Sequence, residues 1–199
     1  MRTIEDYRAG CRIVLGDAAG RRYSDDVIDM GYREALVCFG QYSPAKETIY
    51  GTLTSVNART GILSGIPGPD TEILSIRTAE GKKLHWTGEW NGQKLYLHFS
   101  DRITPGTGDR LQLEIAVPHT IKGLDQAKKT TVSDTNALLL TKGAAASAMV
   151  LRAHSVTEIF GKRPEDCDNL IAQSEKLHGS FIQGLKVIAL LSGCDQAPW

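Results

Sequence analysis

The stretch Ser133-Asp-Thr-Asn-Ala-Leu-Leu-Leu-Thr-Lys-Gly-Ala-Ala-Ala-Ser-Ala-Met-Val-Leu-Arg-Ala-His-Ser-Val-Thr-Glu-Ile-Phe160 decides the fold of this chain. It predicts one long helix, because Ser133 or Asp134 can accept a hydrogen bond from a free N–H group of the first turn. Gly161 offers the left-handed position at the far end, and Pro164 prevents the helix from continuing.

Two apolar stripes run along this predicted helix. We expect the stripe of larger residues to fill a core and the stripe of smaller residues to let a second backbone approach closely. A helix with both stripes covered lies at the centre of a bundle. The larger stripe comprises Leu138, Ala145, Met149, Val156 and Phe160, and the smaller one Leu139, Gly143, Ala146, Val150 and Ala153.

Three further helices are predicted, two before residue 45 and one after Pro164. Thr3 and Ser24 are suited to cap the first two. The last begins near Pro164 and ends at Gly193, and its apolar residues recur at the spacing of a bundle seam. The residues of this seam are Leu170, Leu177, Phe181, Gly184, Ile188 and Leu191.

Between residues 45 and 120 the helical spacing disappears, and short β-branched and aromatic runs alternate with turn residues. About five strands are predicted, with a Gly- and Pro-rich bend over 61–69. Asn91-Gly92 is the strongest hairpin signal, because a type I′ turn needs positive φ at both central positions. The predicted strands cover 48–54, 72–78, 84–87, 95–99 and 111–117.

These elements predict an α+β fold, in which a four-helix bundle carries an inserted antiparallel β-sandwich or barrel module. Residues 1–44 and 133–193 form the expected bundle, and residues 45–120 the module. Residues 121–132 are expected to be a linker, and residues 194–199 a C-terminal tail.

The charge is balanced, with 23 basic and 23 acidic residues among 199. Balance disfavours a nucleic-acid-binding protein, which needs a basic face, and also a membrane-surface protein. The first residues lack the apolar segment of a signal peptide. The four scattered cysteines are expected to be free thiols made in a reducing cytoplasm.

The sequence contains none of the HExxH, GxSxG, GxxxxGK[ST] or GxGxxG motifs. We therefore expect no catalytic residues, no cofactor and no metal, and a protein that is not an enzyme. Two alternatives stay open: His85 and His98 sharing a metal across a hairpin, and a hydrolase whose site assembles only in the fold.

Two groups of residues, each containing tryptophan, are candidates for binding a partner. Trp86, Trp90, Tyr96 and His98 lie close together in sequence around one hairpin, where they can stack on a sugar or a protein, or form the core of the module. Ala197, Pro198 and Trp199 resemble a docking peptide, because a tryptophan beyond the last helix has few ways to bury itself. The opposing interpretation is a tail without function.

Several short segments in a fixed order resemble the head–tail connector (neck or adaptor) proteins of tailed bacteriophages and prophages. They span most of the chain, and the likeness weakens after Arg152. The segments are Leu15-Gly16-Asp17, Tyr23-Ser24-Asp25-Asp26, Tyr42-Ser43-Pro44, Gly108-Asp109-Arg110-Leu111, Ala116-Val117-Pro118-His119-Thr120-Ile121, Gly123-Leu124-Asp125, Thr130-Thr131-Val132, Leu138–Leu140, Gly143-Ala144-Ala145, Ala148 and Arg152-Ala153.

The resemblance implies a structural virion protein, located in the neck between head and tail and made in the cytoplasm of the bacterial host. Such connectors form a homo-oligomeric ring, commonly of twelve subunits, below the portal protein. The ring extends the channel through which double-stranded DNA passes without specific binding, and provides the docking surface for tail or tail-completion proteins. The expected partners include no membrane. In related adaptors the C-terminal segment often inserts between portal subunits, a role suited to Trp199.

The alternative is a carbohydrate- or receptor-binding phage module that uses the aromatic β hairpin. It predicts a monomer or trimer whose glycan binding is lost on Trp86→Ala or Trp90→Ala, whereas the connector interpretation predicts neither.

Overall fold

The structure is a computed structural model that describes residues 2–57, 59–100, 105–160 and 164–191. Over these described residues it has a mixed α+β fold with four helices and one antiparallel, barrel-like sheet. The chain divides into two compact units. Residues 1–45 and 118–199 belong to the helical unit, and residues 46–117 form the β unit, where the sequence predicts an inserted module over 45–120.

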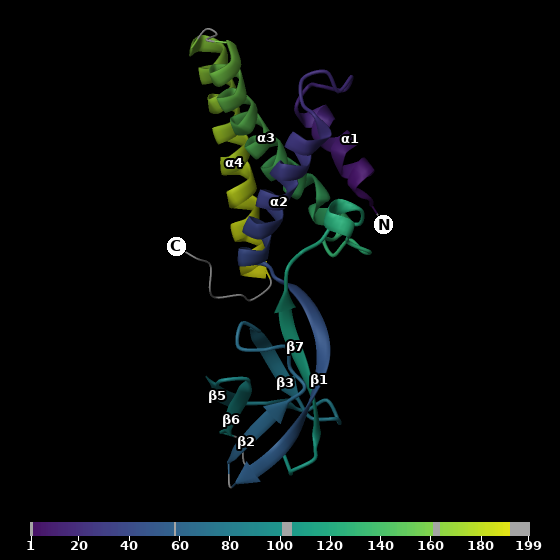
Figure 1. Ribbon diagram of the computed structural model, residues 1–199, viewed down its shortest axis with the longest axis vertical. Coiled ribbons are helices and arrows are strands. Elements are labelled where there is room, and N and C mark those ends of the chain that lie inside the picture. The colour runs from purple at the N-terminus through teal and green to yellow at the C-terminus, as the bar shows by residue number, and fades with distance from the viewer. Residues whose placement is uncertain (1, 58, 101–104, 161–163, 192–199) are drawn as a thin grey trace. The chain divides into compact units, whose positions relative to one another are not determined.

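The helical unit is built around its third helix. That helix packs against each of the other three, and Figure 1 shows it running beside the last one. The four helices are α1 (Ile4–Val14), α2 (Asp25–Tyr42), α3 (Ala137–Phe160) and α4 (Pro164–Leu191). Two short 3-10 turns, η1 (Leu124–Gln126) and η2 (Asp134–Asn136), precede α3.

The buried side of α3 differs from the predicted stripes. Leu138 is 61% exposed, whereas Leu140 is fully buried, so the prediction that Leu138 fills the core is wrong. The reason is that α3 is apolar around most of its circumference, and periodicity alone does not select the inward side. Ala145 and Met149 are buried as expected. Val156 and Phe160 lie outside the residues whose side chains are described.

The predicted seam of α4 is partly correct. Phe181 is buried, and Leu170, Leu177 and Ile188 pack against the same core, but Leu191 is 84% exposed. Glycines permit close helix packing here, since a Cβ added to Gly143 would be 2.8 Å from the Phe181 ring.

Residues 121–132 are not a simple linker. Ile121 and Leu124 are buried in the core of the helical unit. The segment also holds the start of the chain, because the N–H of Ile4 donates to the carbonyl oxygen of Lys122 at 2.9 Å and the Thr130 hydroxyl donates to that of Arg2 at 2.7 Å. Its apolar residues are too few to show helical or strand periodicity, and so their burial was not predicted.

The β unit is one sheet in the order β4-β3-β7-β1-β2-β6-β5. Its two edge strands, β4 and β5, are separated in the chain by a single residue, His85, which brings the edges of the sheet together and makes it nearly closed. The strands are β1 (Ala45–Asn57), β2 (Thr60–Ser64), β3 (Ile73–Arg77), β4 (Lys83–Leu84), β5 (Trp86–Asn91), β6 (Lys94–Phe99) and β7 (Arg110–Val117).

The structure describes seven strands where about five were predicted, and two local predictions also need correction. The first half of the predicted bend over 61–69 is strand β2, in which Leu63 is fully buried opposite Leu95 of β6. The hairpin at Asn91-Gly92 is confirmed, but Asn91 pairs with Lys94, so Gly92 is the first central residue and has φ +61°. Glycine at that position is typical of a type II′ turn.

Candidate interaction surface

The two predicted groups of binding residues have different outcomes. Ala197, Pro198 and Trp199 lie outside the described residues. In the β unit, Trp86 lies opposite Phe99 and Trp90 opposite Leu95, and both tryptophans pack against the core.

Tyr96 and His98 lie on the other face of the sheet from the tryptophans, because side chains alternate along β6 and both Leu95 and Leu97 are buried. The four side chains therefore do not form one aromatic surface. The strand partners of His98 are Thr60 and Thr87 rather than His85.

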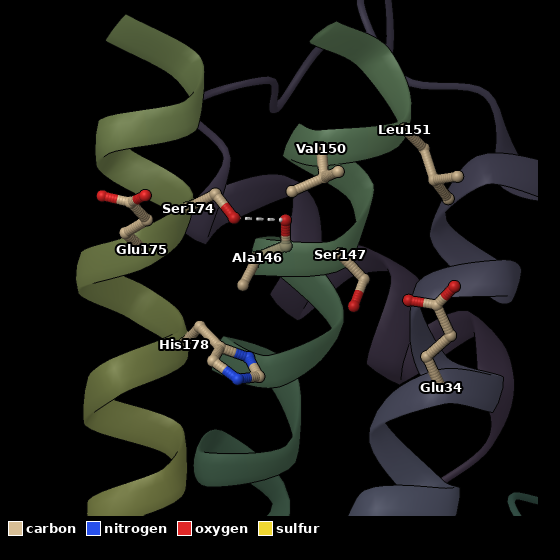
Figure 2. Close-up of a pocket in the computed structure, with 8 residues that line it drawn as sticks. All are labelled: Glu34, Ala146, Ser147, Val150, Leu151, Ser174, Glu175 and His178. Carbon is tan, nitrogen blue, oxygen red and sulfur yellow. Dashed lines mark hydrogen bonds between the residues drawn. The ribbon is translucent and has the colours of Figure 1, made fainter. Parts of the chain in front are cut away.

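The helical unit contains an open groove of about 310 Å³ between α2, α3 and α4 (Figure 2). In this view the floor is α3, with α2 on one side and α4 on the other. The residues that line the groove are Glu34 from α2, Ala146, Ser147, Val150 and Leu151 from α3, and Ser174, Glu175 and His178 from α4.

The groove exists because the residues between the helices are small. Ser174 occupies the place in the α4 seam where the spacing from Leu170 to Leu177 calls for an apolar side chain. Its buried hydroxyl donates to the carbonyl oxygen of Ala146 at 3.0 Å, the contact drawn in Figure 2. The serine hydroxyl and the alanine carbonyl oxygen are hydrogen-bonded to each other, but these two small residues do not fill the space that a leucine would occupy.

The groove is acidic and has apolar side chains at its rim. Glu34 and Glu175 are exposed, and no lysine or arginine is among the described residues that line it, whereas Arg33 borders the hollow next to Glu34. Val37 is 67% exposed beside Glu34 on α2, and Val150 is 37% exposed on α3. This surface was not predicted from the sequence. Its one signal there is Ser174, which interrupts the apolar seam of α4.

A second feature of the helical unit is a polar cluster at the loop between α1 and α2. The buried carboxylate of Asp17 accepts hydrogen bonds from the backbone N–H groups of residues 21, 22 and 23, at 2.9 to 3.0 Å. Burial acts to raise the pKa of Asp17, but these three bonds outweigh it and leave the pKa below its ordinary value. The guanidinium of Arg152 stacks over the Tyr23 ring at 4.9 Å and donates to the carbonyl oxygen of Arg22.

A third feature surrounds His119, next to the end of α2. Its Nε2 donates to the carbonyl oxygen of Ser43 at 2.5 Å, so the neutral ring accepts the Thr131 hydroxyl at Nδ1, at 3.0 Å. The ring also meets Phe39 edge-on, with centroids 4.9 Å apart. Burial lowers the pKa of His119, and the bond to Ser43 opposes that shift only in part.

Within the described residues, no group of three or more His, Cys, Asp or Glu side chains is placed to hold a metal ion. Cys11 and Cys38 are free thiols, the Cys167 thiol contacts the carbonyl oxygen of Ala153, and Cys194 lies outside the described part of the chain. Burial raises the pKa of Cys11 to about 12, so its thiol is a poor nucleophile at neutral pH. None of the described helices is long and apolar enough to cross a membrane.

A comparison of the chain with protein-family models and with curated protein sequences finds no match.

Proposed function

We propose that this protein is a head–tail connector of a tailed bacteriophage or prophage, which forms a ring below the portal. The ring extends the DNA channel and provides the surface on which the tail docks. In this proposal the four helices act as a bundle around α3, and its outer sides are the contacts between neighbouring subunits. The outer face of β6, with Tyr96 and His98, is then available to a tail protein or a neighbouring subunit.

One observation supports the proposal. The sequence resembles connectors in several short segments that are far apart in the chain, and some of these segments contact one another in the fold. Asp17, Tyr23 and Arg152 belong to three such segments and form the polar cluster between α1 and α2. Ser43, His119 and Thr131 belong to three others and form one hydrogen-bonded group. Because the resembling segments contact one another, the resemblance supports the proposal more strongly than it would if the same residues were scattered over the surface.

Measuring the mass of the purified protein by light scattering, alone and mixed with the portal ring from the same genome, tests the proposal. We expect the protein to join the portal as a ring of fixed stoichiometry. Deleting Ala197–Trp199 is expected to abolish this association while leaving the melting temperature unchanged. An intact protein that fails to bind the portal at any concentration or ionic strength would overturn the proposal.

Carbohydrate binding by the hairpin is not favoured as a second candidate function. It needs an aromatic face on the hairpin, whereas Trp86 and Trp90 pack against the core of the β unit, on the other side of the sheet from Tyr96.

A further inference from the structure

The segment over residues 122–130, which we name the basic loop, has a fixed shape. The N–H of Gly123 donates to the carbonyl oxygen of Ala127 at 2.9 Å, and the N–H of Lys122 donates to the Thr130 hydroxyl at 2.9 Å. At its tip, Asp125 and Gln126 both have left-handed backbone conformations, with φ +49° and +62°. Such conformations are unfavourable for residues other than glycine, and where they occur they often mark functional positions.

Arg33 of α2 holds this tip in place. Its guanidinium makes a two-pronged contact with the Asp125 carboxylate, at 3.0 Å from Nε and 2.6 Å from Nη2. The hydrogen bond from Arg33 lowers the pKa of Asp125, a carboxylate that is already charged at neutral pH at its ordinary pKa near 3.9. The loop is therefore ordered before any partner arrives, which reduces the entropy that binding would cost.

The charge that remains on this loop is positive. Lys122, Lys128 and Lys129 are exposed, and within the described residues their side chains form no hydrogen bond or ion pair. The one acidic residue of the loop, Asp125, is already paired with Arg33. The groove between α2, α3 and α4 has the opposite character, since its charged groups are Glu34 and Glu175, neither of which has an ion-pair partner within the described residues.

The basic loop and the groove involve different residues of α2. Consecutive residues of an α-helix point about 100° apart, so Arg33, which contacts the loop, and Glu34, which lines the groove, point in different directions, although both border a shallow hollow beside Val37. Within the described residues, none of the loop's side chains lines the groove of its own chain. A closed ring of identical subunits requires two different surfaces on each subunit, one of which is complementary to the other surface on the neighbouring subunit.

We infer that the basic loop of one subunit docks on the acidic groove of the next subunit, with Lys128 and Lys129 facing Glu34 and Glu175. The occupant of the groove is thus a second copy of this chain. The inference rests on the proposed ring and specifies its subunit contact.

Charge reversal with complementation tests this contact. The first variant is Lys128→Glu with Lys129→Glu, and the second is Glu34→Lys with Glu175→Lys. Each alone places like charges together at every interface, so we expect ring formation on the portal to weaken by on the order of tenfold or more. An equimolar mixture restores complementary contacts, because each acidic loop then faces a basic groove, and assembly should recover with the two variants alternating.

Lys82→Glu with Lys83→Glu is the matched control, because these lysines are also adjacent, exposed and reversed by the same total charge. It should assemble as the natural protein does. A mixture of isotopically labelled and unlabelled protein, treated with a carbodiimide, should also give crosslinks between Lys128 or Lys129 of one copy and Glu34 or Glu175 of another.

The outcomes separate the two proposals. If the natural protein never joins the portal, the proposed function fails. If it forms rings and the reversed variants do so equally well, the loop–groove contact is wrong while the proposed function stands. Crosslinks that join Glu34 or Glu175 to the portal instead of to a second copy would likewise overturn the contact, by giving the groove a different occupant.

Discussion

Gly31 of α2 lies against the carbonyl oxygen of Ala144 in α3, with no space between them for a methyl group. This contact sets the separation of the two helices. The Ala144 carbonyl oxygen belongs to the backbone, so it cannot move to another rotamer as a side chain could. The groove beside α3 depends on the same geometry, since Glu34 follows Gly31 by one turn of α2.

Gly31→Ala should therefore destabilise the protein by about 1–3 kcal/mol, the usual range for inserting a methyl group into a packed core. Gly40→Ala in the same helix is the control, since nothing lies within 4 Å of a Cβ added there. That variant should gain about 0.5–1 kcal/mol, because alanine favours a helix more than glycine does. Urea unfolding of both variants measures the difference, and equal effects would contradict this account of the α2–α3 contact.

Asp17 should make the protein sensitive to acid. Its pKa is lowered in the folded state, so the stability it provides is present above the ordinary aspartate pKa near 3.9 and is lost as the pH falls below it. Asp17→Asn should be less stable at pH 7, and the difference from the natural protein should shrink as the pH is lowered through about 4 to 2. A difference in melting temperature that stays constant over this range would contradict the role of the charge.

His119 should add a second pH dependence, at higher pH. Its pKa is lowered by burial, so the neutral ring stabilises the fold above the ordinary histidine pKa near 6.5. As the pH falls from 6.5 toward the lowered pKa, the unfolded chain binds a proton first, and stability should fall by at most about 1.4 kcal/mol per pH unit. His119→Gln should flatten the stability profile between pH 7 and 5, and a profile that keeps the slope of the natural protein would contradict this role of the ring.

Replacing Gln126 with glycine should make the folded protein more stable. Gln126 has φ +62°, a conformation that glycine adopts without strain, so Gln126→Gly should raise stability by about 0.5–1 kcal/mol. Gln183→Gly, in the interior of α4, should lower stability by about 1 kcal/mol. Opposite shifts in melting temperature are the expected result, and a loss in both variants would show that the tip of the basic loop is not strained.

Trp90 should contribute more than His98 to the stability of the β unit. Trp90 packs against the core, so Trp90→Ala should cost about 2–3 kcal/mol, whereas His98→Ala, on the exposed face, should stay within about 0.5 kcal/mol. Denaturant unfolding followed by circular dichroism measures both. Equal costs would mean that the tryptophans are not core residues.

The sequence alone was enough to predict where most elements lie. Ser24 was expected to cap α2, and its side chain does accept the N–H of Val27. Apolar and polar residues alternate over 111–117, which predicts that Leu111, Leu113, Ile115 and Val117 point inward; the first three are buried and Val117 is half-buried. These features depend on neighbours within one turn of helix or one strand, and local chemistry is what a single sequence records.

What the tertiary structure decided was which of several equivalent surfaces face inward. Leu138 and Leu140 are chemically alike, and only the packing of three helices around α3 buries one and exposes the other. The acidic groove likewise depends on Glu34 and Glu175, which are 141 residues apart in the chain (175 − 34) and come together only when α2 and α4 both pack on α3. Such contacts arise from the meeting of distant segments, and no local pattern specifies which segments meet.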